Sequence, residues 1–157
     1  HHGGYDQAVY AYAREDADWW EKELSQSIAN GRFGENLTTS GIDVNGALVG
    51  ERWKIGTTIL EVSQPRIPCR VFAGFWQRPK LIKEFMASGK PGTYLRIIQE
   101  GHISAGDEIE VISKPQHHIS IADLYAAKNG ERSKVEEIAA VKELSGKYQE
   151  WAQSLLS

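Results

Sequence analysis

Ser63-Gln64-Pro65-Arg66-Ile67-Pro68-Cys69-Arg70 is the stretch around which the rest of the chain is interpreted. It holds the only cysteine of the chain, and two prolines precede that cysteine. Because proline has no N–H to donate to a sheet, a strand that enters this stretch must end before the thiol. The sequence therefore predicts that Cys69 lies on a stiff loop at a strand end, a common location for a reactive group.

The composition is that of an ordinary globular protein of 157 residues, with 41% hydrophobic and 25% charged residues. A formal charge of −3 indicates neither a nucleic acid nor a membrane surface as a partner. One cysteine cannot form an internal disulfide, and no apolar run approaches the roughly 18 residues of a membrane span. These features predict a cytoplasmic protein with no membrane partner.

The first two thirds of the chain have a mainly β pattern. Apolar residues at three- and four-residue steps over residues 5–24 indicate an amphipathic helix, although its first part could be a short strand. Residues 25–31 suggest a helical turn, and residues 33–39 an extended segment. Further strands are expected at 52–55 and 58–63, joined by a tight turn at Gly56-Thr57, and at 94–99 and 108–113, with the last two facing each other.

Helical patterns dominate the remainder. One helix is expected over residues 80–87, closed by Ser88-Gly89. After Pro115, three helices are expected over residues 119–128, 133–144 and 146–156. The predicted fold class is therefore α+β, mainly β, with a β domain over residues 1–114 and a small helical module over residues 115–157.

Cys69 lies between Arg66 and Arg70, and positive neighbours favour the thiolate, the form that binds a metal or attacks an electrophile. A lone cysteine also often packs in a core, so residue context leaves both interpretations open. Asn36, Gln64 and the Gly3-Gly4 backbone would suit an anion or a heterocycle rich in donors and acceptors, although each one alone is more often a cap or a turn residue.

The histidines and the large aromatic residues give weaker signals. His2 precedes two glycines and Asp6, which could form a backbone cradle for a ligand, but His1-His2 could also be the remnant of a tag. His117-His118 has no zinc spacing to other ligands and is interpreted as a surface pair. Four aromatic residues are expected in the core or at an interface: Trp19, Trp20, Phe75 and Trp76.

Three motifs follow one another in the chain: His2-Gly3-Gly4-Tyr5-Asp6-Gln7-Ala8-Val9, Phe33-Gly34-Glu35-Asn36-Leu37 and Gln64-Pro65-Arg66-Ile67-Pro68-Cys69. In this order they resemble the MOSC domain family (molybdenum cofactor sulfurase C-terminal domain), in particular its stand-alone YiiM-like members. The resemblance covers about residues 2–113, and the helical tail is similar to the three-helix module of that subfamily. It implies a MOSC-type β-barrel followed by this module.

The resemblance also sets expectations for the chain's start. Members usually have some tens of residues before the His-Gly-Gly motif, which supply strands to the barrel, so residues upstream of His1 are expected to be missing. Tyr5 stands where members often have proline, and Gln7 replaces a common basic residue. One contact to an anion is therefore expected to be lost.

The resemblance further implies binding of the molybdenum cofactor (Mo-molybdopterin), with Cys69 as the metal ligand and with Cys69 and His2 as catalytic residues. The implied cofactor-binding residues are Gly3, Gly4, Asp6, Asn36, Thr38, Gln64, Arg66 and Arg70. The implied activity is the reduction of N-hydroxylated compounds, with N-hydroxylated purines or related bases as substrates and a detoxifying role. The family is also described, at its own level, as binding pyridoxal phosphate.

Electrons for such a reduction are expected from an external electron-donor protein, because the sequence has no flavin, haem or iron–sulfur motif. A homodimer would fit exposed tryptophans. Two alternatives stay open: a cofactor carrier or sulfur-transfer module that uses a Cys69 persulfide, and a binding domain in which the cysteine is structural.

Overall fold

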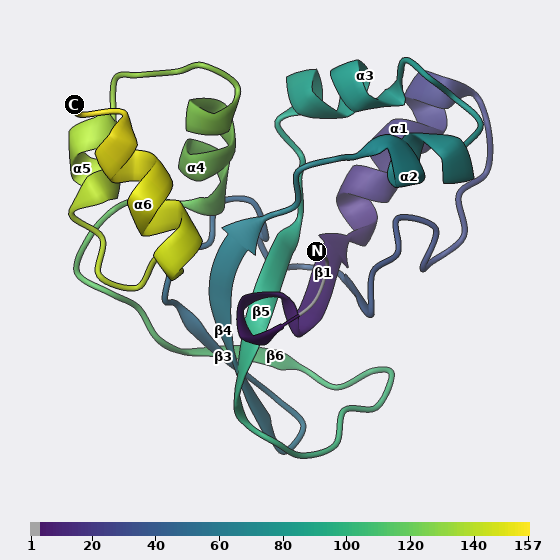
Figure 1. Ribbon diagram of the computed structural model, residues 1–157. Coiled ribbons are helices and arrows are strands. Elements are labelled where there is room, and N and C mark those ends of the chain that lie inside the picture. Colours follow the sequence, from purple (N-terminus) through teal and green to yellow (C-terminus); the bar gives the residue numbers. More distant parts are fainter. Residues whose placement is uncertain (1–3) are drawn as a thin grey trace.

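The computed structural model describes residues 4–157 (Figure 1). Six strands form one curled, mixed sheet in the order β2-β1-β5-β4-β3-β6. Only the β1–β2 pair is parallel among the pairings of these strands. The strands are β1 (Val9–Ala13), β2 (Leu37–Thr39), β3 (Arg52–Ile55), β4 (Thr58–Pro65), β5 (Thr93–Gln99) and β6 (Ile109–Ser113).

The helices form two groups in Figure 1, one around α1 to α3 and one made of α4 to α6. A short 3₁₀ turn, η1 (Tyr5–Gln7), precedes β1. The helices are α1 (Arg14–Leu24), α2 (Arg70–Phe75), α3 (Leu81–Ser88), α4 (Ile121–Lys128), α5 (Val135–Ala139) and α6 (Gly146–Ser154). The predicted α+β fold is confirmed, and α4 to α6 follow the last strand, whereas α1 to α3 lie between strands in the chain order.

Strand β1 separates two apolar cores, because alternate side chains of a strand point to opposite faces. Ala11 and Ala13 belong to the core that the sheet shares with α4 and α6, whereas Tyr10 and Tyr12 belong to an aromatic core beneath α1 to α3. Since both faces of this strand are buried, its apolar residues do not alternate with polar ones. The helical interpretation of residues 5–24 is therefore wrong for its first part, and the strand alternative is right.

Several other expectations are confirmed, with changed bounds. The hairpin of β3 and β4 has its turn at Gly56-Thr57, and β4 is internal because β3 and β5 flank it. Helix α3 ends at Gly89, which adopts the left-handed conformation expected of a helix terminator. The three C-terminal helices are present, but the second is only five residues long.

Three details differ from the sequence expectations. Residues 25–31 form no helix: Ser25 has a φ of 53°, which ends α1, and an irregular turn follows. Strand β6 pairs with β3 and not with β5, because β1 and β4 already occupy both edges of β5. Helix α2 was not expected. Its residue Phe72 and the C-cap residue Trp76 are buried in the aromatic core, and this burial stabilises a helix of only six residues.

The larger core crosses the predicted boundary at residue 114. Leu124 of α4 and Tyr148 of α6 belong to the same buried cluster as Leu60 and Val62 of β4. The division into residues 1–114 and 115–157 stays a prediction, and this shared core suggests that the two parts unfold together.

Candidate functional site

Cys69 lies on the loop that links β4 to α2. The strand ends at Pro65, and Cys69 is the residue directly before the first helical residue, Arg70, with an extended backbone (φ −132°, ψ 177°). Pro68 is buried, whereas Cys69 is half-buried and packs against the aromatic core. The expected position of Cys69, on a loop after a strand end, is therefore confirmed.

Arg66 joins the second and third sequence motifs. Its Nη1 donates a hydrogen bond to the carbonyl of Phe33, and its guanidinium carbon lies 4.5 Å from the ring centroid of Phe72 and 5.1 Å from that of Tyr10. These contacts hold the guanidinium against the second motif and against two rings of the aromatic core. Gly34 lies against the same side chain: a Cβ at this position would approach Nη1 to 3.3 Å, and its φ of +81° favours glycine.

Tyr94 lies near both Arg66 and Cys69. It is opposite Gln64 in the β4–β5 register. Burial raises the pKa of Tyr94, the guanidinium of Arg66 opposes this shift, and the Cys69 thiol adds to it. Gln64 itself is buried at the end of β4, and its carbonyl lies 3.5 Å from the Thr93 hydroxyl. Gln64 is thus the strand neighbour of a tyrosine whose pKa responds to both Arg66 and Cys69, and the sequence did not single out this tyrosine.

Asn36 has a structural role in the sheet. Its Oδ1 accepts a hydrogen bond from the Tyr10 N–H (2.8 Å), and its own N–H donates to the Tyr10 carbonyl (2.9 Å). These bonds extend the parallel pairing of β1 and β2 by one residue. The Thr38 hydroxyl donates to Glu35 Oε2 (3.0 Å). Asn36 and Thr38 both line a cavity of about 380 Å³ that also contacts residues 103–107.

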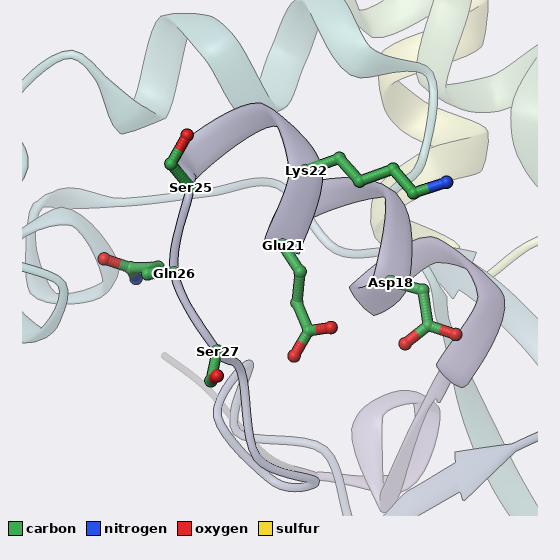
Figure 2. Close-up of a pocket in the computed structure, with 6 residues that line it drawn as sticks. All are labelled: Asp18, Glu21, Lys22, Ser25, Gln26 and Ser27. Atoms are coloured by element: carbon green, nitrogen blue, oxygen red, sulfur yellow. The ribbon is translucent and has the colours of Figure 1, made fainter.

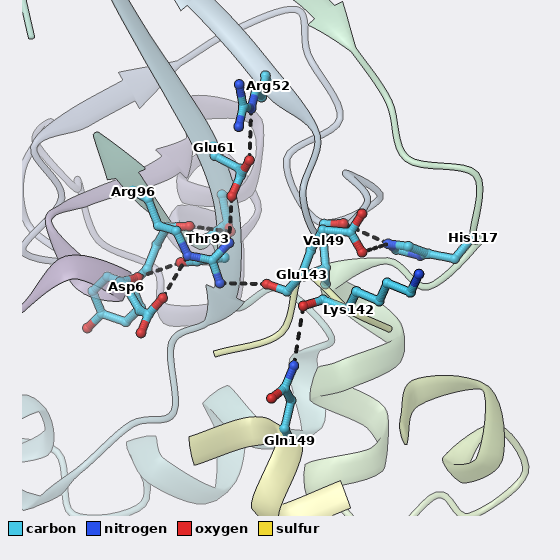
Figure 3. A network of polar contacts seen from close by, with 12 residues as sticks. Asp6, Val49, Arg52, Glu61, Thr93, Arg96, His117, Lys142, Glu143 and Gln149 are labelled. Atoms are coloured by element: carbon cyan, nitrogen blue, oxygen red, sulfur yellow. Dashed lines mark hydrogen bonds and ion pairs between the residues drawn. The ribbon is translucent and has the colours of Figure 1, made fainter. Parts of the chain in front are cut away.

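Asp6 is bound by the protein on both its backbone and its side chain (Figure 3). Its carbonyl accepts a hydrogen bond from the Ser63 hydroxyl, and its Oδ1 accepts one from Arg96 Nε at 2.6 Å. Arg96 is buried and also donates to Glu61 Oε1 (2.7 Å) and to the Glu143 carbonyl (2.7 Å). Sequence reasoning missed Arg96, although a single cation in the otherwise apolar run of β5 was a signal.

The remaining predicted site residues do not join this group. Arg70 is exposed on α2 and lines a hollow of about 520 Å³ formed by α2, α3 and their connection. Gly4 is exposed, with a φ of +86°, directly before η1. His2 and Gly3 lie outside the described residues.

An open cavity of about 690 Å³ contains none of the predicted site residues (Figure 2). It lies at the C-terminal end of α1, and its lining is Asp18, Glu21, Lys22, Ser25, Gln26 and Ser27. The Glu21 carboxylate is already used by the Ile28 N–H (2.7 Å) and by Arg14 (3.4 Å). We therefore assign no chemistry to this cavity.

His117 and His118 form no metal site. Nε2 of His117 lies 2.7 Å from the Val49 carbonyl, and Nδ1 accepts a hydrogen bond from the Ile119 N–H. Across residues 4–157, no group of three or more histidine, cysteine, aspartate or glutamate side chains is placed to hold a metal ion. None of the helices in this range is long and apolar enough to cross a membrane.

Comparison with known proteins identifies relatives for most of this chain. The family described as MOSC domain matches residues 1–110. YflK from Bacillus subtilis is 34% identical over 120 residues, which are 76% of this chain and 54% of that protein. A protein named Reductase from Gibberella moniliformis is 29% identical over 127 residues, 78% of this chain and 23% of that protein. The chain thus spans about half or less of the length of these relatives.

A solved structure extends the comparison to the whole chain. The crystal structure of YiiM from Geobacillus stearothermophilus superposes with a TM-score of 0.91 and 33% identity, covering 99% of this chain and 81% of that one. The likeness therefore includes the six-stranded sheet, the helices α1 to α3 and the C-terminal helices.

Proposed function

This chain belongs to the MOSC domain family, and on this basis we propose that it binds the molybdenum cofactor and reduces N-hydroxylated compounds, with Cys69 as the protein ligand to molybdenum. The observation that carries the proposal is the position of Cys69. The only thiol of the chain is half-buried on the loop that follows an internal strand, and both this thiol and Arg66 act on the pKa of Tyr94. Similarity to a protein named Reductase supports a redox reaction.

The residues around the thiol fit the chemistry of this cofactor. A thiolate is a soft ligand of the kind that suits a redox-active transition metal. Arginine side chains bind phosphate through charge-assisted hydrogen bonds, and Arg70 is exposed next to Cys69 in the sequence. When bound, the cofactor supplies the two-electron redox chemistry of molybdenum.

The chain itself supplies position and access. Buried Pro68 and the first turn of α2 hold Cys69 between two rigid elements. Arg66 is held by the Phe33 carbonyl and by two aromatic rings, so the second motif supports the loop that carries the thiol. Arg96 and Ser63 hold Asp6 and hence the start of the described chain next to β4.

The proposed reaction converts an N–OH group to N–H. It consumes two electrons and two protons and releases one water molecule, and N-hydroxylated purines are the proposed substrates. Among the predicted residues we retain Cys69, Gln64, Arg66 and Arg70 for the cofactor, together with His2, Gly3 and Gly4. The Asp6 carboxylate accepts a hydrogen bond from Arg96, and the side-chain amide oxygen of Asn36 accepts one from the Tyr10 N–H. We therefore propose supporting roles for these two residues.

One observation favours a structural cysteine as the alternative, since Cys69 packs against the aromatic core. Molybdenum analysis separates the alternatives. Protein produced in a molybdate-replete host is expected to contain molybdenum close to one atom per chain, and Cys69→Ser is expected to lose it without a change in thermal stability. Ile67→Ala, an exposed change on the same loop, is the control and should retain the metal.

Two results would contradict the proposal. The first is parent protein without molybdenum, which would favour a structural cysteine or a persulfide carrier; mass spectrometry for an added sulfur atom distinguishes these two. The second is a Cys69→Ser variant that still reduces an N-hydroxylated base with reduced methyl viologen as the electron source. A large loss of stability in Cys69→Ser would also support the structural alternative.

A further inference from the structure

Helix α2 exposes two large apolar side chains directly after Cys69. Val71 is 77% and Phe75 61% exposed, whereas Phe72 of the same helix and Trp76, the residue directly after it, are buried. Val71 and Phe75 are four residues apart and so lie on the same side of the helix. The guanidinium of Arg32 lies 4.4 Å from the ring centroid of Phe75, and this cation–π contact holds the exposed ring in place.

The segment of the chain that contains these two side chains is basic. Residues 66–90 contain six basic residues and one acidic residue, a formal charge of +5. Because the whole chain has a formal charge of −3, the rest of the sequence carries −8. The one acidic residue, Glu84, is bound by Arg78 at 2.7 and 2.9 Å. Within the described part of the chain, Arg70, Lys80 and Lys83 form no ion pair.

We define the α2 face as the exposed apolar residues Val71 and Phe75 with the cations Arg32, Arg70, Arg78, Lys80 and Lys83. The hollow of about 520 Å³ between α2 and α3 belongs to this face, since Arg70 and Arg78 line it. An apolar centre with a charged rim is the usual composition of a protein–protein interface. The α2 face also begins at the residue that follows Cys69.

We propose that the α2 face is the docking surface for an acidic electron-carrier protein that supplies the proposed reductase. This inference rests on the proposed function, which consumes two electrons per N–OH group. The chain has one cysteine and so cannot hold an iron–sulfur cluster with four cysteine ligands. A carrier that binds next to Cys69 delivers its electrons close to the proposed metal ligand.

Charge decides between an acidic carrier and a second copy of this chain. A two-fold contact through the α2 face would place the same basic surface on both sides, which is repulsive. An acidic partner instead gains long-range attraction, which raises the association rate at low ionic strength. The mixture of exposed apolar and basic side chains therefore fits an acidic protein better than a homodimer.

The first test measures binding and needs no cofactor. Apoprotein is titrated with flavodoxin and, separately, with a plant-type ferredoxin, both acidic carriers. We expect binding that weakens as salt is added. Phe75→Ser should raise the Kd about tenfold, and the double variant Lys80→Glu/Lys83→Glu should slow association about tenfold at low salt. The matched control is Lys142→Glu/Lys147→Glu, two exposed lysines outside the α2 face, which should bind like the parent.

The second test measures turnover with two electron sources. Two flavodoxin hydroquinones, each oxidised to the semiquinone, provide the two electrons, and solvent provides the two protons. We expect Lys80→Glu/Lys83→Glu to lose turnover with flavodoxin while keeping the parental rate with reduced methyl viologen. Absence of turnover by the parent with methyl viologen would contradict the proposed function. The binding test uses apoprotein, so it tests the docking proposal for the α2 face whether or not the protein is a reductase.

Three outcomes would overturn the docking proposal. One is parent protein that binds neither carrier in a salt-sensitive manner. Another is unchanged carrier binding by Phe75→Ser and by the lysine variant. The third is a parental dimer that Phe75→Ser converts to a monomer, because the α2 face would then be covered by a second copy.

Discussion

Arg96 Nε and Asp6 Oδ1 are 2.6 Å apart, and this ion pair ties the first described turn of the chain to the middle of β5. Arg96 is only 5% exposed, and it also binds the Glu61 carboxylate and the carbonyl of Glu143, which follows α5 (Figure 3). One buried cation thus joins η1, the sheet and the C-terminal helical region.

Arg96→Leu is expected to lower the free energy of unfolding by about 3–5 kcal/mol, because it leaves the carboxylate of Glu61 without its buried partner. Urea unfolding measures this change. Arg52→Leu is the matched control, since Arg52 binds the other oxygen of the same Glu61 carboxylate but has a half-exposed side chain. That variant should lose less than about 1 kcal/mol. Equal losses would show that the buried network has no special role.

Two aspartates at the third position of a helix are expected to respond in opposite ways to pH. Burial raises the pKa of Asp16 in α1, with hydrogen bonding to Asn45 opposing the shift. Burial also acts to raise the pKa of Asp123 in α4, but hydrogen bonds from Ser120 and Lys134 outweigh it and lower the pKa. Asp123 belongs to a capping box with Ser120.

A carboxyl group with a lowered pKa contributes stability above its unfolded pKa, near 4, and this contribution is lost as the pH falls through the folded pKa. Asp123→Asn is therefore expected to lower the free energy of unfolding by about 1 kcal/mol at neutral pH. The difference in stability between this variant and the parent should become smaller in acid. Asp16→Asn should cost nothing at neutral pH, because ionised Asp16 is already unfavourable. Thermal unfolding at neutral and acidic pH tests both, and a larger neutral-pH loss for Asp16→Asn would contradict the assigned signs.

The glycines at 31 and 34 provide a test of the Arg66 contact. Both have a positive φ, but a Cβ at Gly31 meets no atom within 4 Å, whereas one at Gly34 approaches Arg66 Nη1. In each alanine variant, backbone strain should lower the free energy of unfolding by about 1 kcal/mol. Only Gly34→Ala should displace Arg66 and lower the molybdenum content of the purified protein. Equal metal contents in the two variants would argue against a role for Arg66 in holding the cofactor.

The shared core predicts that the β part and the C-terminal helices unfold together. Leu124→Ala in α4 should lower the free energy of unfolding by about 2–5 kcal/mol, since Leu124 is fully buried among residues of the sheet and of the C-terminal helices. The variant should still show one transition by fluorescence and by circular dichroism. Leu156→Ala, at a half-exposed position, is the control and should cost well under this amount. Two separate transitions in the parent would support independent domains divided at residue 114.

Local patterns predicted much of the fold. The hairpin at Gly56-Thr57, the end of α3 at Gly89 and the helices after Pro115 all depend on turn, cap and periodicity signals that act over a few residues. Strand β1 was ambiguous in the sequence because both of its faces are apolar. Helix α2 was not predicted because six residues are too few to show a helical periodicity.

The candidate site was predictable in part. The place of Cys69 followed from the prolines around it, because proline restricts the backbone whatever the rest of the fold does. The uses of Asp6 and Asn36 did not follow, because their partners Arg96 and Tyr10 are 90 and 26 residues away in the sequence. Such pairings depend on which strands become neighbours, and local signals do not contain that information.

The sequence by itself therefore determined most of the local elements, the position of Cys69 on a loop after a strand and the order of the three motifs, since each depends on backbone restriction or on nearby residues. Only the tertiary structure decided that β6 pairs with β3, that Arg66 donates a hydrogen bond to the Phe33 carbonyl, and that Arg70 is exposed on the α2 face. The physical reason is burial: which side chains lose water, and against which partners, is set when distant strands and helices pack together.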